Sequence, residues 1–319
     1  MMTSFSGLPG RISILALLLL VAVSCKKGDD TVAAPQTIPD RVLEDSQFSL
    51  LRVALAYAGV SDALKSGNLT LFAPTDSAFQ ASGFGSISSI QSLSRDQVRS
   101  MMLYHVLYGS VTSAQIPSGF NAVETVGKGI AFFTKSNDGT IYINNAKLTQ
   151  PDLVTANGYI HKVNRLLTPS AGNLLTTIQS NPNLTFLAAA VKRIGTSNPT
   201  LLATLNNSSS TNTVTVFAPN DEAFKADSRY NTITAIESAD QQTLANTLLY
   251  HVTSGVLFSN QLKTGTLTSL FNTNKFTVTV APNQITLKGN RNATFATIRQ
   301  ADIPTTSGLI HVIDKVLQP

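Results

Sequence analysis

The sequence contains a single cysteine, Cys25, among its 319 residues. A chain with one cysteine forms no internal disulfide, so outside the cytoplasm it depends on packing alone for stability. Charged residues are also scarce, at 13% of the chain, while 43% of the residues are hydrophobic. The net charge of +5 is scattered in short clusters such as Lys192-Arg193, which excludes the extended positive surface that neutralises many phosphates. We therefore expect a folded protein that does not bind nucleic acid.

The signature motifs of common enzymes are missing as well. The sequence has no Gly-x-Ser-x-Gly, no phosphate-binding loop and no His-Glu-x-x-His. Glutamate occurs only at positions 44, 124, 222 and 237, so paired-carboxylate chemistry would have to use aspartates, most of which fall in predicted turns or helix caps. The sequence therefore predicts a protein that is not an enzyme and that holds no cofactor and no metal.

The N-terminus has the features of an export signal. Residues 12–23 form an apolar run that follows Arg11 and is too short to span a bilayer, which takes about 20 residues. The run ends in Ala22-Val-Ser-Cys25, which resembles the acylation site of bacterial lipoproteins. We expect a signal peptide over 1–24 and a lipidated Cys25 with a flexible tether over 25–35. The protein is then an outer-membrane lipoprotein of a Gram-negative bacterium, facing the periplasm or exposed at the cell surface.

The rest of the chain is an internal duplication. The segment Thr70-Leu-Phe-Ala-Pro-Thr-Asp-Ser-Ala-Phe79 returns, 145 positions later, as Thr215-Val-Phe-Ala-Pro-Asn-Asp-Glu-Ala-Phe224. Tyr104-His105 returns as Tyr250-His251, and the Gly-x-Ile-His motif that begins at Gly158 returns at Gly308. The offset changes in loop-like segments, which indicates two separately folded copies. We place the first copy at 36–169 and the second at 170–319.

Each copy has the same predicted order of elements. An amphipathic helix over 48–58 or 184–194 ends at a glycine. A buried strand over 69–73 or 214–218 then leads into a helix that Thr75 or Asn220 caps. After a second long helix that ends at Tyr-His, the remaining segments alternate as strands, and each copy closes on a strand over 159–167 or 309–317. The order predicts an α+β domain with antiparallel strands and helices packed on one side.

These motifs, in this order and in both copies, resemble the fasciclin-like domain. They are the Phe-Ala-Pro-Thr-Asp segment, the Tyr-His pair about thirty residues later, and the Asn-Gly-Tyr-Ile-His ending that begins at Asn157. The first copy departs from the family pattern with Lys162 for valine and Asn164 for aspartate. The resemblance implies a barrel-like or sandwich-like antiparallel β-core with packed helices, a role in adhesion outside cells, and no catalytic residues.

The resemblance also implies candidate interaction residues. Segments linked to adhesion in animal members of the family map onto Tyr104, His105, Tyr250 and His251, and a Pro-Asp-Ile segment maps onto Asp152 and Asp302. The alternative assignment for the same residues is a packed helix end and a polar turn. For the four histidines we expect core groups satisfied by hydrogen bonds, because all of them lie on apolar segments.

The predicted function is a membrane-tethered, non-enzymatic adhesion or binding module that contacts an unidentified protein or polysaccharide. Two copies on one tether favour avidity. One alternative is a glycan-binding or other ligand-binding component of a periplasmic or surface assembly. A second alternative is a hydrolase with an unrecognised site, for which a single polar substitution would abolish turnover.

Overall fold

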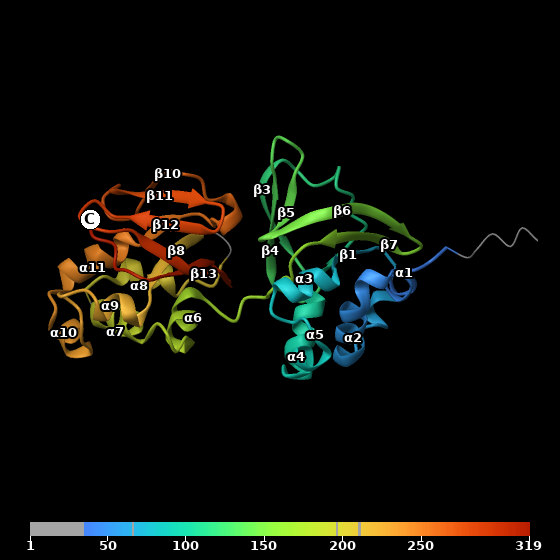
Figure 1. Cartoon of the computed structure of the whole chain (residues 1–319), viewed down its shortest axis with the longest axis horizontal. Coiled ribbons are helices and arrows are strands. Elements are labelled where there is room, and N and C mark those ends of the chain that lie inside the picture. The colour runs from blue at the N-terminus through green and yellow to red at the C-terminus, as the bar shows by residue number, and fades with distance from the viewer. Residues whose placement is uncertain (1–34, 66, 196, 210–211) are drawn as a thin grey trace, which may run out of the picture. The chain divides into compact units, whose positions relative to one another are not determined.

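The computed structural model describes residues 35–319 except residues 66, 196, 210 and 211 (Figure 1). The predicted signal peptide, Cys25 and nearly all of the tether therefore lie outside the described residues. Within the described part, no helix combines the length and the apolar character that a membrane crossing requires.

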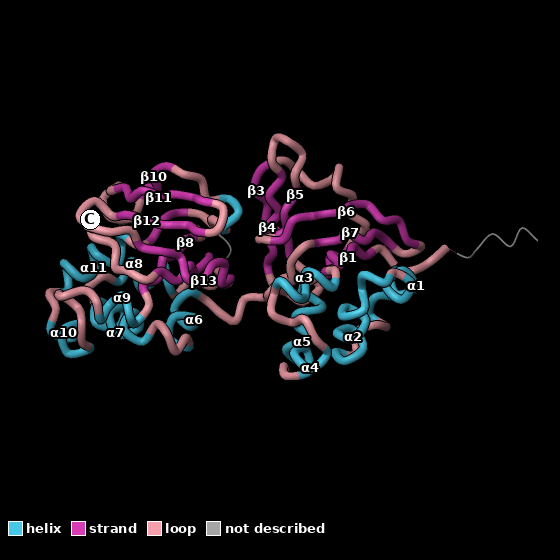
Figure 2. The backbone as a smooth tube through the Cα atoms, viewed as in Figure 1, coloured by secondary structure: helices cyan, strands magenta, loops and turns pink. Residues whose placement is uncertain are grey.

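The two copies share one architecture, a mixed seven-stranded sheet with helices packed against it (Figure 2). The strand order is β2-β1-β7-β6-β5-β4-β3 in the first copy and β9-β8-β14-β13-β12-β11-β10 in the second, which is the same order. All pairings are antiparallel except β1 with β7 and β8 with β14. The α+β class with a barrel-like β-core is thus confirmed, with one parallel pair in each copy.

The first copy combines α-helices with short 3₁₀ helices, which are labelled η. Its helices are α1 (Ile38–Glu44), η1 (Ser46–Phe48), α2 (Ser49–Ala58), η2 (Ala63–Lys65), α3 (Asp76–Ala81), α4 (Ile87–Gln91) and α5 (Arg95–Tyr104). Its strands are β1 (Leu69–Pro74), β2 (Val106–Tyr108), β3 (Gly119–Glu124), β4 (Ile130–Lys135), β5 (Ile141–Ile143), β6 (Ala146–Thr155) and β7 (Gly158–Val163).

The second copy repeats this series. Its helices are α6 (Leu174–Ser180), α7 (Thr185–Ile194), α8 (Pro199–Leu205), α9 (Asp221–Lys225), α10 (Ile233–Ser238), α11 (Gln241–Tyr250) and η3 (Ser259–Gln261). Its strands are β8 (Val214–Pro219), β9 (Val252–Ser254), β10 (Gly265–Thr268), β11 (Lys275–Ala281), β12 (Gln284–Lys288), β13 (Ala296–Thr305) and β14 (Gly308–Ile313).

The strand-to-helix corner Pro74-Thr-Asp76, which returns as Pro219-Asn-Asp221, stabilises two helices at once. Thr75 caps its own helix α3 by accepting a hydrogen bond from the Ala78 amide. The next residue, Asp76, reaches back to α2 and accepts from the Leu50 amide at 2.8 Å and from the Ser49 hydroxyl at 2.5 Å. Asp221 does the same for α7 in the second copy. A carboxylate near exposed helix amides is stabilising, so the aspartates of this motif are explained by capping.

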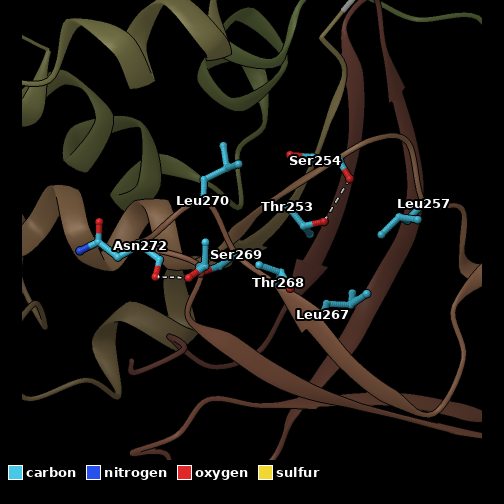
Figure 3. A pocket seen from close by; sticks show the side chains of 9 residues that line it. Thr253, Ser254, Leu257, Leu267, Thr268, Ser269, Leu270 and Asn272 are labelled. Atoms are coloured by element: carbon cyan, nitrogen blue, oxygen red, sulfur yellow. Dashed lines mark hydrogen bonds between the residues drawn. The ribbon is translucent and has the colours of Figure 1, made fainter.

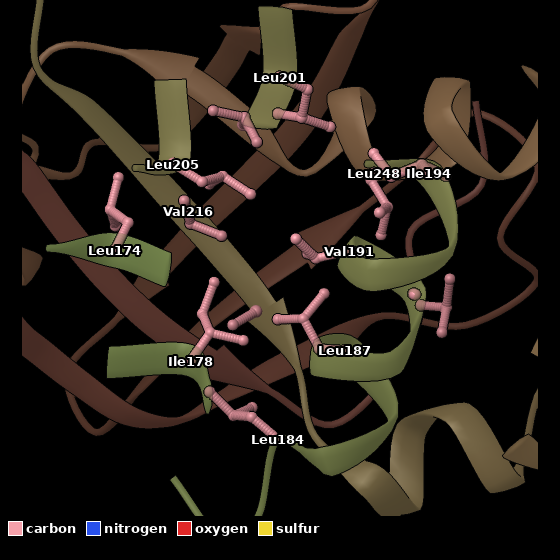
Figure 4. Close-up of a cluster of buried hydrophobic side chains, with 14 of the residues drawn as sticks. Leu174, Ile178, Leu184, Leu187, Val191, Ile194, Leu201, Leu205, Val216 and Leu248 are labelled. Atoms are coloured by element: carbon pink, nitrogen blue, oxygen red, sulfur yellow. The ribbon is translucent and has the colours of Figure 1, made fainter. Parts of the chain in front are cut away.

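A continuous apolar core lies between the sheet and the helices of each copy. In the second copy the side chains of α6, α7 and α8 converge on β8, as Figure 4 shows for Leu187, Val191 and Val216. The first copy has an equivalent cluster around Leu51, Leu55 and Leu71. The helical spacing read from the sequence therefore selects the buried face correctly.

The last strand of each copy is shorter than the sequence predicts. We expected strands over 159–167 and 309–317, but β7 ends at Val163 and β14 ends at Ile313. The apolar residues that follow do not pair in the sheet. Instead the Leu167 and Leu317 amides donate to buried histidines, which accounts for their burial without extended pairing.

The glycine of each Gly-x-Ile-His motif allows the parallel strands to approach closely. A Cβ atom on Gly158 would lie 1.8 Å from the Leu69 carbonyl oxygen, and one on Gly308 would lie 2.0 Å from the Val214 oxygen. Gly158 also has a φ of 145°, which side-chain-bearing residues rarely adopt. Any side chain here would push β7 away from β1, or β14 away from β8.

We predict that Gly308→Ala destabilises the second copy by about 3 kcal/mol or more, because overpacking costs about 1 to 3 kcal/mol where side chains can yield, and here the obstruction is backbone. Gly195→Ala is the matched control, since Gly195 has a helical φ of −56° and its added Cβ would meet only ordinary contacts. The control should be neutral or slightly stabilising. Denaturant unfolding of both variants checks this, and an unchanged midpoint for Gly308→Ala would contradict the close approach.

Candidate functional site

The histidine of each Tyr-His pair lies in the core at the end of a helix. His105 is fully buried directly after α5, where its Nδ1 donates to the Met101 carbonyl oxygen at 2.8 Å. Its Nε2 accepts from the Leu167 amide at 2.9 Å. His251 repeats both contacts with the Thr247 oxygen at 2.7 Å and the Leu317 amide at 2.8 Å. Each imidazole thus joins the end of a helix to the segment that follows the last strand.

The second histidine of each copy belongs to a network with the candidate aspartates. In the first copy, the His161 Nε2 donates to the Val111 carbonyl oxygen at 2.9 Å, and its Nδ1 accepts from the Asp152 amide at 3.0 Å. The Asp152 carboxylate accepts in turn from the amide and the hydroxyl of Ser113. His311 and Asp302 make the same contacts with Leu257 and Ser259 in the second copy.

The two aspartates occupy a strained position in the backbone. Asp152 and Asp302 have φ values of 61° and 63°, at a bulge in β6 and in β13 where the strand register shifts. The left-handed conformation turns each amide toward the histidine and each carboxylate toward the serine. Burial raises the pKa of Asp152, but the hydrogen bonds from Ser113 outweigh it and hold that pKa below its ordinary value.

The tyrosines of the Tyr-His pairs are also buried. The Tyr104 hydroxyl donates to the Ile130 carbonyl oxygen at 2.7 Å, and the Tyr250 hydroxyl donates to the Lys275 oxygen at the same distance. Burial raises the pKa of Tyr104 to about 12, so the phenol is protonated at neutral pH.

The imidazoles are neutral at physiological pH. Burial lowers the pKa of His105 and of His251 to about 4, and it lowers the pKa of His161 and His311 as well. The hydrogen-bond partners fix the tautomers: His105 and His251 carry the proton on Nδ1, whereas His161 and His311 carry it on Nε2. Both ring nitrogens of each histidine are therefore occupied, and none is left to abstract a proton or to ligate a metal.

The structure brings His161 together with Asp152, and His311 with Asp302, but it keeps the Tyr-His pairs in a separate network. Among the described residues no group of three or more histidine, cysteine or acidic side chains is arranged to hold a metal ion. Sequence reasoning missed Ser113 and Ser259, which tie the aspartates to the loop after β2 or β9. Their separation of 146 positions, the same as that of the Tyr-His pairs, is the signal that could have found them.

The second copy also carries an open groove of about 620 Å³ (Figure 3). Its lining side chains are either hydroxyls and amides or leucines: Thr253, Ser254, Leu257, Leu267, Thr268, Ser269, Leu270, Asn272 and Thr273. None of these lining residues is ionisable, so the groove offers hydrogen bonds and apolar contact but no acid or base.

The family model of the fasciclin domain matches residues 46–169 and 182–319. The chain belongs to the fasciclin family. The two matches agree with the two copies seen in the structure and with the duplicated motifs. Fasciclin domains serve as adhesion or binding modules in homologous proteins.

Relatives of the fasciclin copies occur in bacteria and animals. A Synechocystis protein, sll1483, is 32% identical over 42% of this chain and 73% of its own length. The pig transforming growth factor-beta-induced protein ig-h3 is 28% identical over 80% of this chain, and Drosophila Fasciclin-1 is 25% identical over 95% of it. This chain spans 34% and 47% of those two animal proteins.

A solved structure of a domain pair from the insect cell adhesion molecule Fasciclin I is also similar. It is 18% identical and aligns with a TM-score of 0.41 over 84% of this chain and 95% of its own. The fasciclin assignment itself depends on the family model and the shared motifs.

That six candidate residues contact a partner remains a prediction. These residues are Tyr104, His105, Asp152, Tyr250, His251 and Asp302. In the folded protein their polar atoms are engaged in internal hydrogen bonds, and the tyrosines and histidines among them are at most 2% exposed. The geometry corresponds to the alternative assignment, a packed helix end and a polar turn.

The buried histidines predict a pH dependence of fasciclin-domain stability. Since the pKa of His105 and His251 is about 4 in the fold and 6.5 when exposed, the unfolded chain binds more protons between these values. Stability is therefore complete above pH 6.5 and falls as the pH falls toward 4. From pH 7 to pH 5 we expect a loss of about 2 kcal/mol for each of these two histidines, at 1.36 kcal/mol per pKa unit.

Replacing one histidine shows how much of the pH-dependent stability comes from each fasciclin copy. His251→Ala should cost the second copy about 1 to 3 kcal/mol at pH 7, because the Leu317 amide loses its buried acceptor. The same variant should reduce the pH dependence of the second copy and leave the first unchanged. Denaturant melts at pH 7 and pH 5, with and without chelator, provide the measurement. A midpoint of the unmodified protein that shifts with chelator would contradict a purely structural role.

Proposed function

We propose that this protein is a non-enzymatic adhesion or binding module held at the bacterial envelope by a lipid on Cys25. The observation that carries the proposal is the fasciclin fold present in two complete copies, in which the same motif residues make the same internal hydrogen bonds. Side chains that could serve acid–base chemistry are used to hold each copy together. The outer surface of each copy is left for contact with other molecules.

Similarity to adhesion proteins supports this proposal. The insect Fasciclin I domain pair comes from a cell adhesion molecule, and Drosophila Fasciclin-1 matches nearly the whole chain at 25% identity. Two binding copies on one tether raise the effective concentration of the second site once the first has bound. Weak individual contacts are then sufficient for adhesion.

The tether is the part of the proposal that depends on the sequence alone. An acylated cysteine at position 25 would leave about ten residues before the first described residue, Pro35. At about 3.3 to 3.6 Å per residue, this segment reaches roughly 35 Å when extended. That length separates the first copy from the lipid headgroups while keeping it near the membrane.

A Cys25→Ala exchange in cells that express the full chain tests both parts of the proposal. Without acyl chains, each of which contributes about 0.8 kcal/mol per buried methylene, the variant should leave the membrane fraction. Cells with the unmodified chain should adhere to one another or to a polysaccharide-coated surface, and cells with the variant should not.

Beads coated with purified variant protein are the control, because they restore tethering without lipid. The proposal predicts that these beads adhere as the unmodified cells do. Unchanged membrane partitioning of Cys25→Ala would contradict the lipid anchor. Beads that fail to adhere to any cell or polysaccharide surface would contradict the binding function.

A further inference from the structure

The first copy carries a small polar pocket. It lies between α1 with η1 on one side and β6 with β7 on the other, and its volume is about 350 Å³. Ligand pockets span roughly 300 to 1,000 Å³, so this one suits a single small unit and not an extended chain. Its polar lining consists of Arg41, Glu44, Asp45, Gln150 and Lys162, and its apolar lining of Phe48, Leu153 and Ile160.

A partly buried ion pair, whose Asp45 side chain is 30% exposed, forms one wall of the pocket. The Lys162 Nζ donates to the Asp45 carboxylate at 2.6 Å and to the Gln47 side-chain oxygen at 3.2 Å, and it lies 5.2 Å from the centre of the Phe48 ring. The Lys162 side chain is only 10% exposed. An ammonium group has three N–H donors, and the described residues supply acceptors for two of them. The remaining donor has the Phe48 ring nearby and no oxygen acceptor among the described residues.

The second copy shows that the fold does not need these charges. At the equivalent positions it has Val312 for Lys162, Asn181 for Asp45, Thr177 for Arg41 and Ser180 for Glu44. Val312 is buried in the apolar core. Because a buried ion pair is often no more stabilising than apolar residues of similar volume, stability alone does not account for the charged set in the first copy.

The rim of the pocket carries polar groups that are still available for bonding. Arg41 uses one N–H to reach the Gln36 side-chain oxygen at 3.0 Å, which leaves its other donors available. Glu44 and Gln150 are exposed, and no other described residue forms a hydrogen bond or an ion pair with their side chains. The rim therefore presents donors and acceptors side by side.

We propose that this pocket of the first copy binds a neutral hexose unit of a glycan. The inference rests on the proposed binding function and names its ligand class. Two cations and two anions line the pocket, so their net charge is zero and neither an anion nor a cation is attracted overall. Each sugar hydroxyl donates one hydrogen bond and accepts up to two, so the several hydroxyls of one hexose can bond between them to the guanidinium, the carboxylate, the amide and the ammonium. The partly exposed side chain of Leu153 offers an apolar contact for the C–H face of the ring.

A glycan array probed with the full chain in detergent tests the inference. The array carries neutral hexose oligosaccharides, uronate-containing oligosaccharides and single amino acids, each attached to the surface through a linker. We expect retention on the neutral hexoses, and a loss of about tenfold or more in affinity for the double variant Arg41→Thr, Glu44→Ser, which installs the residues of the second copy. A tenfold loss corresponds to about 1.4 kcal/mol.

Two further variants make the result specific. Asp62→Ser with Lys65→Thr removes one exposed anion and one exposed cation of the first copy outside the pocket, and it should bind as the unmodified chain does. Lys162→Val with Asp45→Asn removes both members of the buried pair, so neither charge is left alone, and it should fold but lose binding.

Three outcomes would overturn the inference: binding that the pocket variants leave unchanged, binding to uronates or amino acids in place of neutral hexoses, or no glycan binding. If glycan binding fails while coated beads still adhere, the ligand assignment is wrong and the adhesion function stands. If the array binds neutral hexoses but beads do not adhere, the pocket stands and the adhesion function is wrong.

Discussion

The hydrogen bonds of two buried, neutral imidazoles connect segments of each copy that are distant from one another along the chain. His105 links the end of α5 to the Leu167 amide, 62 residues later, and His161 links β7 to the Val111 oxygen, 50 residues earlier. These hydrogen bonds are strong because the histidines are shielded from water, where the local dielectric is low. The same low dielectric makes a charged imidazole costly, so the rings stay uncharged. Each histidine is therefore a cross-link within the fold, and it is repeated faithfully in the second copy by His251 and His311.

The comparison of the two copies separates what the fold requires from what it permits. Positions that hold the fold, such as Asp76 with Asp221 and Ser113 with Ser259, keep the same residue and the same contacts in both copies. Positions around the pocket of the first copy differ in charge between the copies. A duplication thus provides an internal control, because one copy shows how the same backbone is stabilised without a given side chain. The proposed sugar contacts belong to the second class of position, where the same fold accepts different charges.

The sequence alone predicts much of this architecture. Helices α2 and α7, the strands β1 and β8 and the caps at Thr75 and Asn220 follow from periodicity and capping chemistry, and the structure confirms them. Periodicity did not predict where β7 and β14 end, because the apolar residues after Val163 are buried by a side-chain hydrogen bond and not by sheet pairing. The left-handed Asp152 could not be foreseen either, since its conformation depends on the bulge in β6 and on partners at Ser113 and His161. The pocket of the first copy needed the fold as well, because Arg41 and Lys162 lie far apart in the sequence. Lys162 had appeared only as a departure from the family pattern.

The central claim is that all four histidines are neutral structural groups with both ring nitrogens bonded inside the fold. Nitrogen NMR of the imidazole rings in the full, isotope-labelled chain tests it most directly, because the shifts of Nδ1 and Nε2 report both charge and tautomer. At pH 7.5 the account predicts four neutral rings, with the proton on Nδ1 in His105 and His251 and on Nε2 in His161 and His311, and no change when Zn²⁺ is added. A ring that titrates near its ordinary pKa of about 6.5, or one whose shifts change with Zn²⁺, would contradict the account.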